Sequence, residues 1–326
     1  MKNRELIQRG AHRFALEILG LYTVLWITGT SWYPLGKNIY EEDWDALIIL
    51  DACRVDALRE VAPEYDYIKE VDSVMSIAGT SKEWVDHTFT EKYQSEVAET
   101  AYITANSFAE QLAEEDRDYL RYLESEKSIA YKSDLFHKYL SRDKLNSDDF
   151  HTFTPLFKQI VGDPVDQLHP EVVTDVAIRT ARKSDANRLL VHYMQPHKPY
   201  LYAYSQSESY KDRHRRPFKY LRQTGNKHRV WQDYLDNLRF VLDHVETLLS
   251  NTDAKKVVIT ADHGEMFGEL GMTGHKAGII HPVLRWVPWC VTRAEDSGEY
   301  EPSEHLTDDQ ATEKEVQNRL DALGYT

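Results

Sequence analysis

Side chains that can bind a metal ion follow a short apolar run late in the chain. Residues 257–259 are Val, Val and Ile, a β-branched run typical of a buried strand, and Asp262 and His263 come soon after it. Open α/β sheets bind ligands in the crevice beyond the carboxyl ends of their strands. A carboxylate beside an imidazole at that edge suits a divalent cation. The alternative is a simple turn, in which Asp262 is a cap and Gly264 takes a positive φ.

A second Asp follows another apolar run, far earlier in the chain. Residues 46–50 are continuously apolar and end at Asp51, and the residues after it predict a helix. Packing alone does not require two remote strands each to deliver an Asp to one sheet edge. The pattern therefore predicts that Asp51 and Asp262 converge on one cation.

Two neighbouring hydroxyls open the next predicted helix. Residues 80–83, Thr-Ser-Lys-Glu, fit a capping box, so Thr80 can simply be the N-cap. A hydroxyl at this position also suits a nucleophile, because the unpaired N–H groups and the dipole of a helix N-terminus attract an anionic ester. The two interpretations are compatible.

A third predicted strand opens the segment 188–200 and leads to His192 and His197. One buried histidine at such a place is usually structural. Two of them beside Pro196 and Pro199, in a loop that runs along the sheet edge, favour a site.

The elements that must position these residues predict one large α/β domain. Amphipathic helices are predicted over 169–184 and 230–251, and a charged, solvated helix over 110–126. Further strands are predicted at 68–74, 101–104 and 281–291, and a short helix at 313–323. The predicted parts are an N-terminal helical segment 1–40, a catalytic domain 41–295 with a basic surface loop or lid at 205–229, and an acidic tail 296–326.

The composition indicates the size of the core and the classes of partner to expect. The 326 residues are 41% hydrophobic, enough for a substantial core, and 39 basic against 54 acidic residues give a net charge of −15. Nucleic acid is therefore an unexpected partner, because phosphate-backbone binders carry the opposite balance. Cys53 and Cys290 lie beside apolar segments and are expected to be buried free thiols.

The N-terminus combines basic residues with an apolar segment. Lys2, Arg4, Arg9 and Arg13 precede the apolar stretch 14–36, which Glu17 interrupts. This segment fits a helix that docks on the domain or lies in a membrane interface better than a spanning anchor. We expect a cytoplasmic protein with peripheral membrane contact through 14–36.

Together these segments resemble the sulfatase-like branch of the alkaline phosphatase superfamily, and most of all its archaeal hydrolase/transferase proteins, over about residues 44–288. The motifs that carry the resemblance are LDACRVD, AGTSKEW, HYMQPHKPY, and TADHGE followed by GHK and LRWVP. The resemblance implies a three-layer α/β/α sandwich with a mostly parallel central sheet. It also implies one divalent metal ion, Zn, Mn, Mg or Ca, in a site like that of lipoteichoic acid synthase. The implied metal ligands are Asp51, Thr80, Asp262 and His263, and the implied substrate contacts are His197, His192, and His275 or Lys276.

The departures from the family pattern bear on the chemistry. Sulfatases that use formylglycine need Cys or Ser followed by x-Pro/Ala-x-Arg, and Cys53 does not fit this pentad, because Arg54, Val55, Asp56 and Ala57 follow it. A plain hydroxyl nucleophile suits phosphoryl transfer better, so phosphoesters are favoured over sulfate esters. Ser81 is an alternative to Thr80 as the nucleophile, because one sequence does not fix the offset to Trp84.

The expected function is a metal-dependent hydrolase or transferase that acts on phosphate mono- or diesters or sulfate esters through a covalent Thr or Ser intermediate. Lys276, His197 and the helix N-terminus would meet the charge on the ester, and His197 or His275 would protonate the leaving group. The substrate would be an anionic ester on a cell-surface glycan or lipid. The alternatives are a catalytically silent glycan- or lipid-binding protein and a membrane-anchored scaffold.

Overall fold

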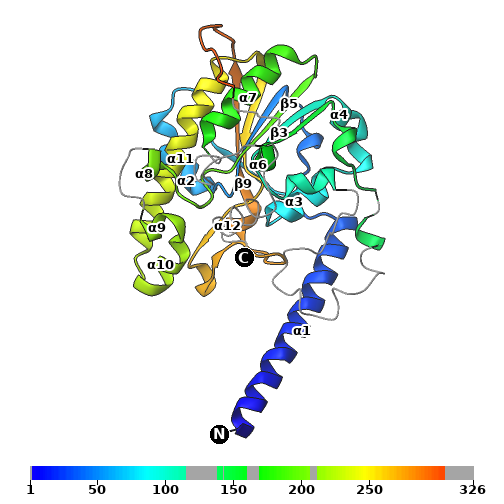
Figure 1. Cartoon of the computed structure of the whole chain (residues 1–326), viewed down its shortest axis with the longest axis vertical. Coiled ribbons are helices and arrows are strands. Elements are labelled where there is room, and N and C mark those ends of the chain that lie inside the picture. Colours follow the sequence, from blue (N-terminus) through cyan, green and yellow to red (C-terminus); the bar gives the residue numbers. More distant parts are fainter. Residues whose placement is uncertain (1, 115–137, 142, 160–168, 206–210, 305–326) are drawn as a thin grey trace.

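A mostly parallel sheet of seven strands forms the centre of the protein (Figure 1). The computed structural model describes residues 2–114, 138–141, 143–159, 169–205 and 211–304. The strand order is β2-β9-β6-β1-β5-β3-β4, and β9 runs antiparallel to both of its neighbours. The strands are β1 (Ala46–Leu50), β2 (Asp72–Met75), β3 (Thr100–Thr104), β4 (Thr152–Pro155), β5 (Arg188–Tyr193), β6 (Ala254–Thr260) and β9 (Trp286–Ala294).

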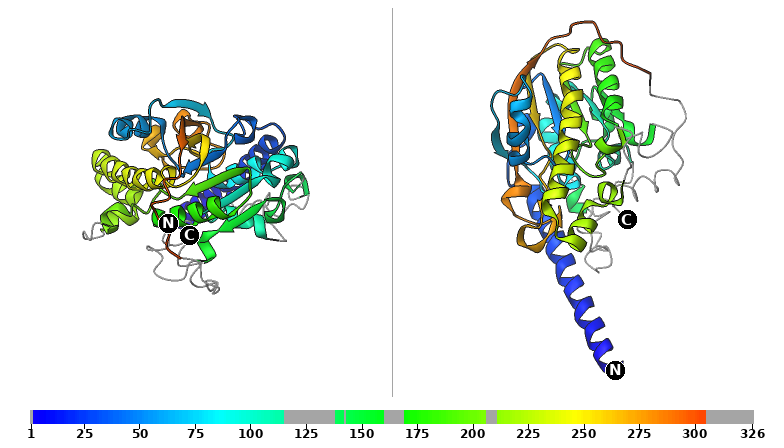
Figure 2. Two further views of the ribbon diagram at one scale, coloured as in Figure 1. Left: turned by 90° about the horizontal axis from the view of Figure 1, so that it is seen from above. Right: turned by 90° about the vertical axis from the view of Figure 1, so that its left-hand side faces the viewer.

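Helices cover both faces of this sheet (Figures 1 and 2). α7 and α11 pack together on one face, and α3 lies on the other, where α1 contacts it. The three-layer α/β/α arrangement with a mostly parallel sheet confirms the predicted fold class. The helices are α1 (Lys2–Trp32), α2 (Val55–Val61), α3 (Ser81–Thr88), α4 (Gln94–Ala98), α6 (Leu156–Gln159), α7 (Pro170–Lys183), α8 (Tyr202–Ser205), α9 (Asp212–Arg215), α10 (Pro217–Thr224), α11 (Lys227–Leu249) and α12 (Pro282–Arg285).

The central strand β1 shows why its run of apolar residues is unbroken. Ile48 and Leu50 belong to the core between the sheet and α7 and α11, whereas Leu47 and Ile49 belong to the core on the α3 side. Both faces of the strand are therefore buried, as in parallel sheets covered by helices on each side. β5 and β6 run parallel on either side of β1, so their carboxyl ends meet at one edge.

Several predicted elements differ from those found. The basic segment 205–229 was expected to be a loop, but its described part forms α9, α10 and the start of α11. Phe218 and Leu221 are buried in the core, and this burial holds α10 in place. The predicted strand 281–291 is the short α12 followed by β9. Of the charged helix predicted over 110–126, the described part is a 3₁₀ turn over Ala109–Ala113, and residues 115–126 lie outside the described chain, as does the helix predicted at 313–323.

Two further predictions concern the cysteines and the domain division. Cys53 and Cys290 are free and buried, as expected. The division at residues 40 and 295 stays a prediction.

The N-terminal helix α1 leaves the domain and projects beyond it (Figures 1 and 2).

Candidate active site

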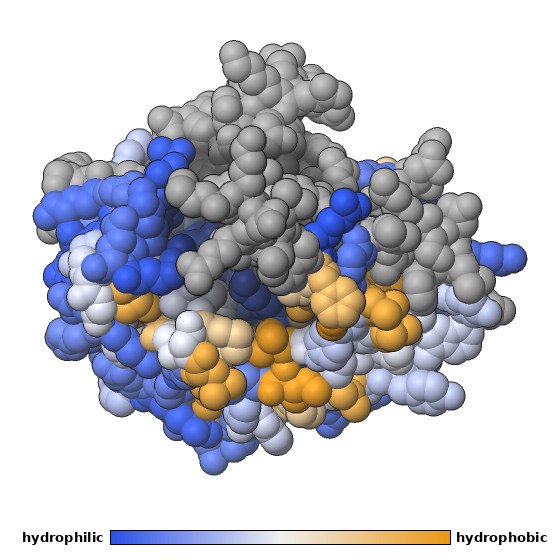
Figure 3. All heavy atoms as spheres, turned by 90° about the horizontal axis from the view of Figure 1, so that it is seen from below, coloured by the Kyte–Doolittle hydropathy of each residue, from blue (hydrophilic) through white to orange (hydrophobic). Residues whose placement is uncertain are grey.

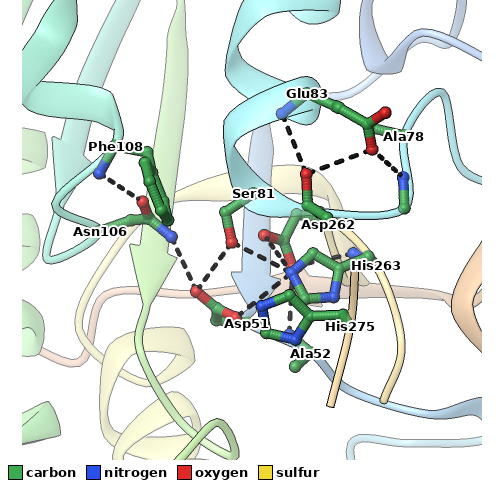
Figure 4. Close-up of polar contacts among 12 residues, drawn as sticks. Asp51, Ala52, Ala78, Ser81, Glu83, Asn106, Phe108, Asp262, His263 and His275 are labelled. Atoms are coloured by element: carbon green, nitrogen blue, oxygen red, sulfur yellow. Dashed lines mark hydrogen bonds and ion pairs between the residues drawn. The ribbon is translucent and has the colours of Figure 1, made fainter. Parts of the chain in front are cut away.

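Three acidic and imidazole side chains converge at the carboxyl edge of the sheet. Asp51 follows β1, and Asp262 and His263 follow β6 (Figure 4). One ligand atom from each of the three lies within 4.8 Å of the other two. We call these residues the strand-end cluster. Their convergence matches the arrangement predicted from two remote strand ends.

The strand-end cluster has the chemistry of a cation site. Asp51 and Asp262 are fully buried, and among the described residues Asp51 Oδ1 and Asp262 Oδ2 have no hydrogen-bond donor. Burial, and after it the negative charge of Asp262, raises the pKa of Asp51 well above its usual range. Two buried carboxylates this close together repel each other, and a divalent cation removes that cost. The residues therefore fit a metal ion.

The other carboxylate oxygens are held in place by hydrogen bonds. The backbone N–H of Ala52, which has a φ of 59°, donates to Asp262 Oδ1 at 3.1 Å. Asn106, two residues beyond β3, donates from Nδ2 to Asp51 Oδ2 at 2.7 Å (Figure 4). Left-handed backbone at a residue such as Ala52 is uncommon and is often found at functional sites. The same oxygens also accept from the backbone N–H of His263, at 2.9 Å from Asp262 Oδ1, and from Ser81 Oγ, at 3.4 Å from Asp51 Oδ2. Each carboxylate is thus oriented by two donors on one oxygen and keeps the other oxygen free of donors among the described residues.

His263 presents one ring nitrogen to this cluster. Its Nδ1 lies 2.7 Å from the carbonyl oxygen of Gly264, so Nδ1 carries the proton and Nε2 keeps its lone pair. Nε2 lies 3.5 Å from Asp262 Oδ2 and 3.8 Å from Asp51 Oδ1. Gly264 does not have the positive φ of the simple-turn alternative; it is required because a Cβ there would collide with the carbonyl of Val283.

The structure brings Ser81, and not Thr80, to the cluster. Ser81 Oγ lies 3.1 Å from His263 Nε2 and 3.4 Å from Asp51 Oδ2 (Figure 4). Thr80 is the N-cap of α3, and its Oγ1 accepts from the N–H of Glu83 at 3.3 Å. The predicted N-cap is confirmed, but the capping box is incomplete, because the backbone N–H that donates to the Glu83 carboxylate is that of Gly79 and not that of Thr80. The cap residue and the residue that faces the strand-end cluster are adjacent, and only the rotation of α3 against the sheet distinguishes them.

His192 lies inside the cluster instead of on the substrate side. Its Nε2 is 3.9 Å from Asp51 Oδ2 and 3.8 Å from Asp262 Oδ2, and the ring is fully buried. Tyr102 contacts the other ring nitrogen, Nδ1, at 3.1 Å. Burial lowers the pKa of His192 to about 4. His192 was predicted to contact the substrate. Its position beside Asp51 and Asp262 fits instead a neutral partner of the two carboxylates.

A second group, the loop cluster, consists of His197, Glu265 and His275. One ligand atom of each lies within 4.8 Å of the other two, so this group could also hold a cation. His275 Nδ1 lies 3.0 Å from Glu265 Oε1, and the His275 ring centre is 4.2 Å from that of His263. Burial lowers the pKa of His197 well below its usual range, and the charge of Lys198 adds to the effect. The loop cluster therefore adjoins the strand-end cluster.

Two lysines near the site were treated differently in the prediction from sequence. Lys276, a predicted substrate contact, has an exposed side chain, and its role stays a prediction. Lys198 was not singled out in the sequence. Burial lowers its pKa, while the carboxylates of Glu265 and Asp51 act in the opposite direction. Lys198 therefore interacts electrostatically with one carboxylate of each cluster.

Sequence reasoning also missed the roles of Asn106 and Glu265. Asn106 follows β3 at the same sheet edge as Asp51, and Glu265 follows the Asp-His-Gly turn. The signal for Asn106 is its place two residues after a strand, which is the same rule that identified the Asp residues. Glu265 is part of the TADHGE motif, but its pairing with His275 depends on the small hairpin β7 (Met266–Phe267) and β8 (Thr273–Gly274).

Comparison with known proteins gives structural neighbours but no sequence relatives. No protein-family profile and no curated protein matches the chain. The C-terminal periplasmic domain of EcEptC from Escherichia coli, in complex with Zn, is 13% identical with a TM-score of 0.42, and the match covers 83% of this chain and 79% of that one. The soluble domain of lipooligosaccharide phosphoethanolamine transferase A from Neisseria meningitidis is 14% identical with a TM-score of 0.46, covering 77% and 76%. BT1596, a 2-O GAG sulfatase, is 11% identical with a TM-score of 0.45, covering 86% and 70%.

These neighbours give no support to the archaeal part of the resemblance, since those with a stated source come from Escherichia coli and Neisseria meningitidis. Phosphoethanolamine transferases and sulfatases are the structural neighbours of this chain, and the sulfatase-like branch of the alkaline phosphatase superfamily is what its sequence resembles.

Proposed function

We propose that this chain is a metal-dependent hydrolase or transferase of phosphate or sulfate esters, with Ser81 as its nucleophile. The observation that carries the proposal is the position of Ser81 Oγ, 3.1 Å from His263 Nε2 and 3.4 Å from Asp51 Oδ2, at the first position of α3. A hydroxyl beside buried acidic and imidazole ligands, at the positive end of a helix dipole, is suited to attack an anionic ester. The proposal replaces Thr80 by Ser81 in both the metal and the nucleophile roles.

Asp51, Asp262, His263 and Ser81 would hold the metal ion. When bound, a divalent ion supplies positive charge that lowers the pKa of a coordinated hydroxyl and neutralises an ester oxygen. Two donors, Asn106 and the Ala52 N–H, keep the carboxylates oriented for it. His263 is held by Gly264 in the tautomer that a metal ligand needs.

The remaining residues have roles in a covalent mechanism. Ser81 Oγ attacks phosphorus or sulfur as its proton leaves toward Asp51 Oδ2, and the bond to the leaving oxygen breaks. Because His275 Nδ1–H is donated to Glu265 Oε1, the acid would be the Nε2–H of the His275 imidazolium, which would give its proton to the leaving oxygen. Lys198 and His197, which adjoin each other in the loop after β5, would stabilise charge on the ester oxygens. Water or an acceptor hydroxyl then releases the group from Ser81.

Phosphoesters remain the favoured substrates. Ser81, at the proposed nucleophile position, does not begin the formylglycine pentad of sulfatases, because Lys82, Glu83, Trp84 and Val85 follow it. Three esters test this preference: an aryl phosphate, a phosphodiester and an aryl sulfate, each assayed with and without added divalent ion. The expected order of turnover places both phosphoesters above the sulfate.

Mass spectrometry of the peptide that contains residue 81, after acid quench, tests the covalent step. The expected result is a modified Ser81 in the wild type and an unmodified peptide in Ser81→Ala. Turnover of all three esters in Ser81→Ala at the wild-type rate would remove the proposal. Binding of metal and esters without turnover by the wild type would instead support the catalytically silent alternative.

We also place the enzyme at a membrane. The stretch Arg13–Trp32 of α1 is 20 residues long with a mean hydropathy of 1.3, so by length and composition it is long enough to cross a bilayer. Phe14, Ile18 and Leu25 on it are more than half exposed. Seen from the end at which α1 projects, apolar side chains gather in one region of the surface (Figure 3). No observation supports the cytoplasmic placement expected from the sequence.

A further inference from the structure

The N-terminal helix α1 contacts the two segments that carry the proposed nucleophile and the proposed acid. Trp26 Nε1 donates to Glu83 Oε1 at 3.0 Å, and Glu83 lies in the first turn of α3, which begins at Ser81. The hydroxyl of Tyr22 donates to the carbonyl of Gly278 at 2.6 Å, in the loop that follows His275. A helix that served only to hold the protein at a membrane would not need polar contacts at either place.

Glu83 is the centre of a hydrogen-bond network around the nucleophile turn. Its second oxygen, Oε2, accepts from Thr80 Oγ1 at 3.2 Å and from the N–H of Gly79 at 3.4 Å. The side chain of Glu83 is therefore bonded to both residues that precede Ser81 and to α1 at once. Buried carboxylates that accept several hydrogen bonds have a fixed orientation, and Glu83 is only 3% exposed.

The far side of this network reaches the metal-binding turn. Arg285 of α12 is 3% exposed, and its positive charge acts on Glu83. Its guanidinium donates to the carbonyl of Leu35, in the segment that follows α1. The neighbouring Leu284 accepts from the N–H of Gly264, directly after His263. The linker after α1, the nucleophile turn and the metal-binding turn are thus connected through buried groups.

We infer that Trp26 and Glu83 are positioning residues for Ser81, so that the docked helix α1 sets the geometry of the nucleophile. The inference rests on the function proposed above. Without the Trp26 N–H, Glu83 Oε1 loses the donor from α1, and the carboxylate is no longer held at its outer end. The turn Gly79-Thr80-Ser81 then gains freedom, and Ser81 Oγ leaves its place beside Asp51 and His263 for part of the time. A shift of this kind lowers the rate of attack more than the binding of the ester.

The test uses the full chain in detergent with an aryl phosphate and saturating divalent ion. Trp26→Phe removes the N–H and keeps an aromatic ring. Its expected kcat is about tenfold below that of the wild type, with KM within about twofold. Trp32→Phe is the matched control, because Trp32 lies on the same helix and packs edge-on against Tyr139, with ring centres 6.1 Å apart. Its expected kcat is that of the wild type.

A double-mutant cycle separates positioning from general destabilisation. Glu83→Ala removes both carboxylate oxygens, so the bond from Trp26 and the network around Gly79 and Thr80 are lost together. If Trp26 acts through Glu83, the kcat of Trp26→Phe/Glu83→Ala equals that of Glu83→Ala alone. A double variant whose kcat falls by the product of the two single effects overturns the inference, as does a Trp26→Phe variant that matches Trp32→Phe. Ser81→Ala in the same assay tests the proposed function separately: full activity there removes the function and not merely the positioning role.

Discussion

The two clusters at the sheet edge are held by different parts of the fold. The residues of the strand-end cluster directly follow β1 and β6. These two strands are paired in register from Ala46 with Val257 to Ile49 with Thr260. The loop cluster depends on connections outside the main sheet. Its His197 is in a loop that α11 holds through Asn237, which donates to the carbonyl of His197 at 3.3 Å. The sheet therefore fixes the half of the site that we propose to bind the metal ion, while contacts outside the strand pairing, among them that of Asn237, fix the half that we propose to face the substrate.

This difference has a chemical consequence. Metal ligands must have a fixed separation, and adjacent parallel strands supply it with little freedom. Groups that contact the ester and its leaving oxygen must suit a particular substrate, and loops can vary for that purpose without disturbing the core. We expect variants of the strand-end cluster to lose all activity, and variants of the loop cluster to lose rate while they retain metal.

The largest expected effect is that of Ser81→Ala. Ser81 is the residue that joins the two halves of the site. Loss of the attacking oxygen should lower kcat by about 10³-fold or more, because the reaction proposed here needs that oxygen to form the covalent intermediate. Thr80→Ala should lower kcat by only about tenfold, since Thr80 Oγ1 bonds Glu83 and acts on Ser81 only through the network of that carboxylate. Steady-state kinetics on one phosphoester suffices. The reverse order of the two variants would return the nucleophile role to Thr80.

Asp262→Asn tests whether the strand-end cluster holds the ion. An added divalent ion at about 100 times its Kd should stabilise the wild type by about 2.7 kcal/mol through mass action, and so raise its Tm by several degrees. Removing one carboxylate should weaken binding by roughly 10²-fold or more, because loss of a partner that merely orients a ligand already costs 10 to 100-fold.

Calorimetry or a thermal shift assay with Zn²⁺, Mn²⁺, Mg²⁺ and Ca²⁺ measures this effect. Without metal, the variant is expected to be about as stable as the wild type. It lacks the repulsion that raises the pKa of Asp51, but it also lacks the attraction to His263 and His192 that lowers the pKa of Asp262. A wild type whose Tm responds to none of the four ions would contradict a cation site at this edge.

His275→Gln tests the loop cluster alone. The variant removes the group that Glu265 orients, so kcat should fall by about 10²-fold, the usual contribution of a general acid. The metal-dependent rise in Tm should remain. Esters with a good leaving group, such as nitrophenolate, need little protonation, so the defect should be smaller for them than for an alkyl ester. Loss of the Tm response in this variant would show that His275 belongs with the metal ligands.

The same division explains what the sequence could predict. Asp51 and Asp262 were identified because each directly ends a local pattern, an apolar run that a buried strand requires. The pairing of Glu265 with His275 and the position of Lys198 depend on segments that meet only in the folded chain. The helix α10 was mistaken for a loop although Pro217 begins it, Gly225 ends it, and Phe218 and Leu221 have helical spacing. The segment was predicted to be a surface loop or lid because it is strongly basic, and the helical spacing of its few apolar residues was overlooked.

The smallest expected effect is the loss of stability in Thr80→Ala. It distinguishes the residue that caps α3 from the residue that we propose to act in the site. Thr80→Ala removes the side chain that accepts from the Glu83 N–H, so it should cost about 1 kcal/mol of unfolding free energy, as loss of an N-cap usually does. Chemical denaturation of the metal-free protein measures the change. Ser81→Ala should lose less stability, because Ser81 does not cap α3 and its hydroxyl faces Asp51 and His263 of the strand-end cluster. The two adjacent hydroxyls would then show different profiles, with the larger loss of stability at residue 80 and the larger loss of turnover at residue 81. Equal losses of stability in the two variants would mean that the hydroxyl of Ser81 also supports the helix, and its loss of activity would then have to be corrected for partial unfolding.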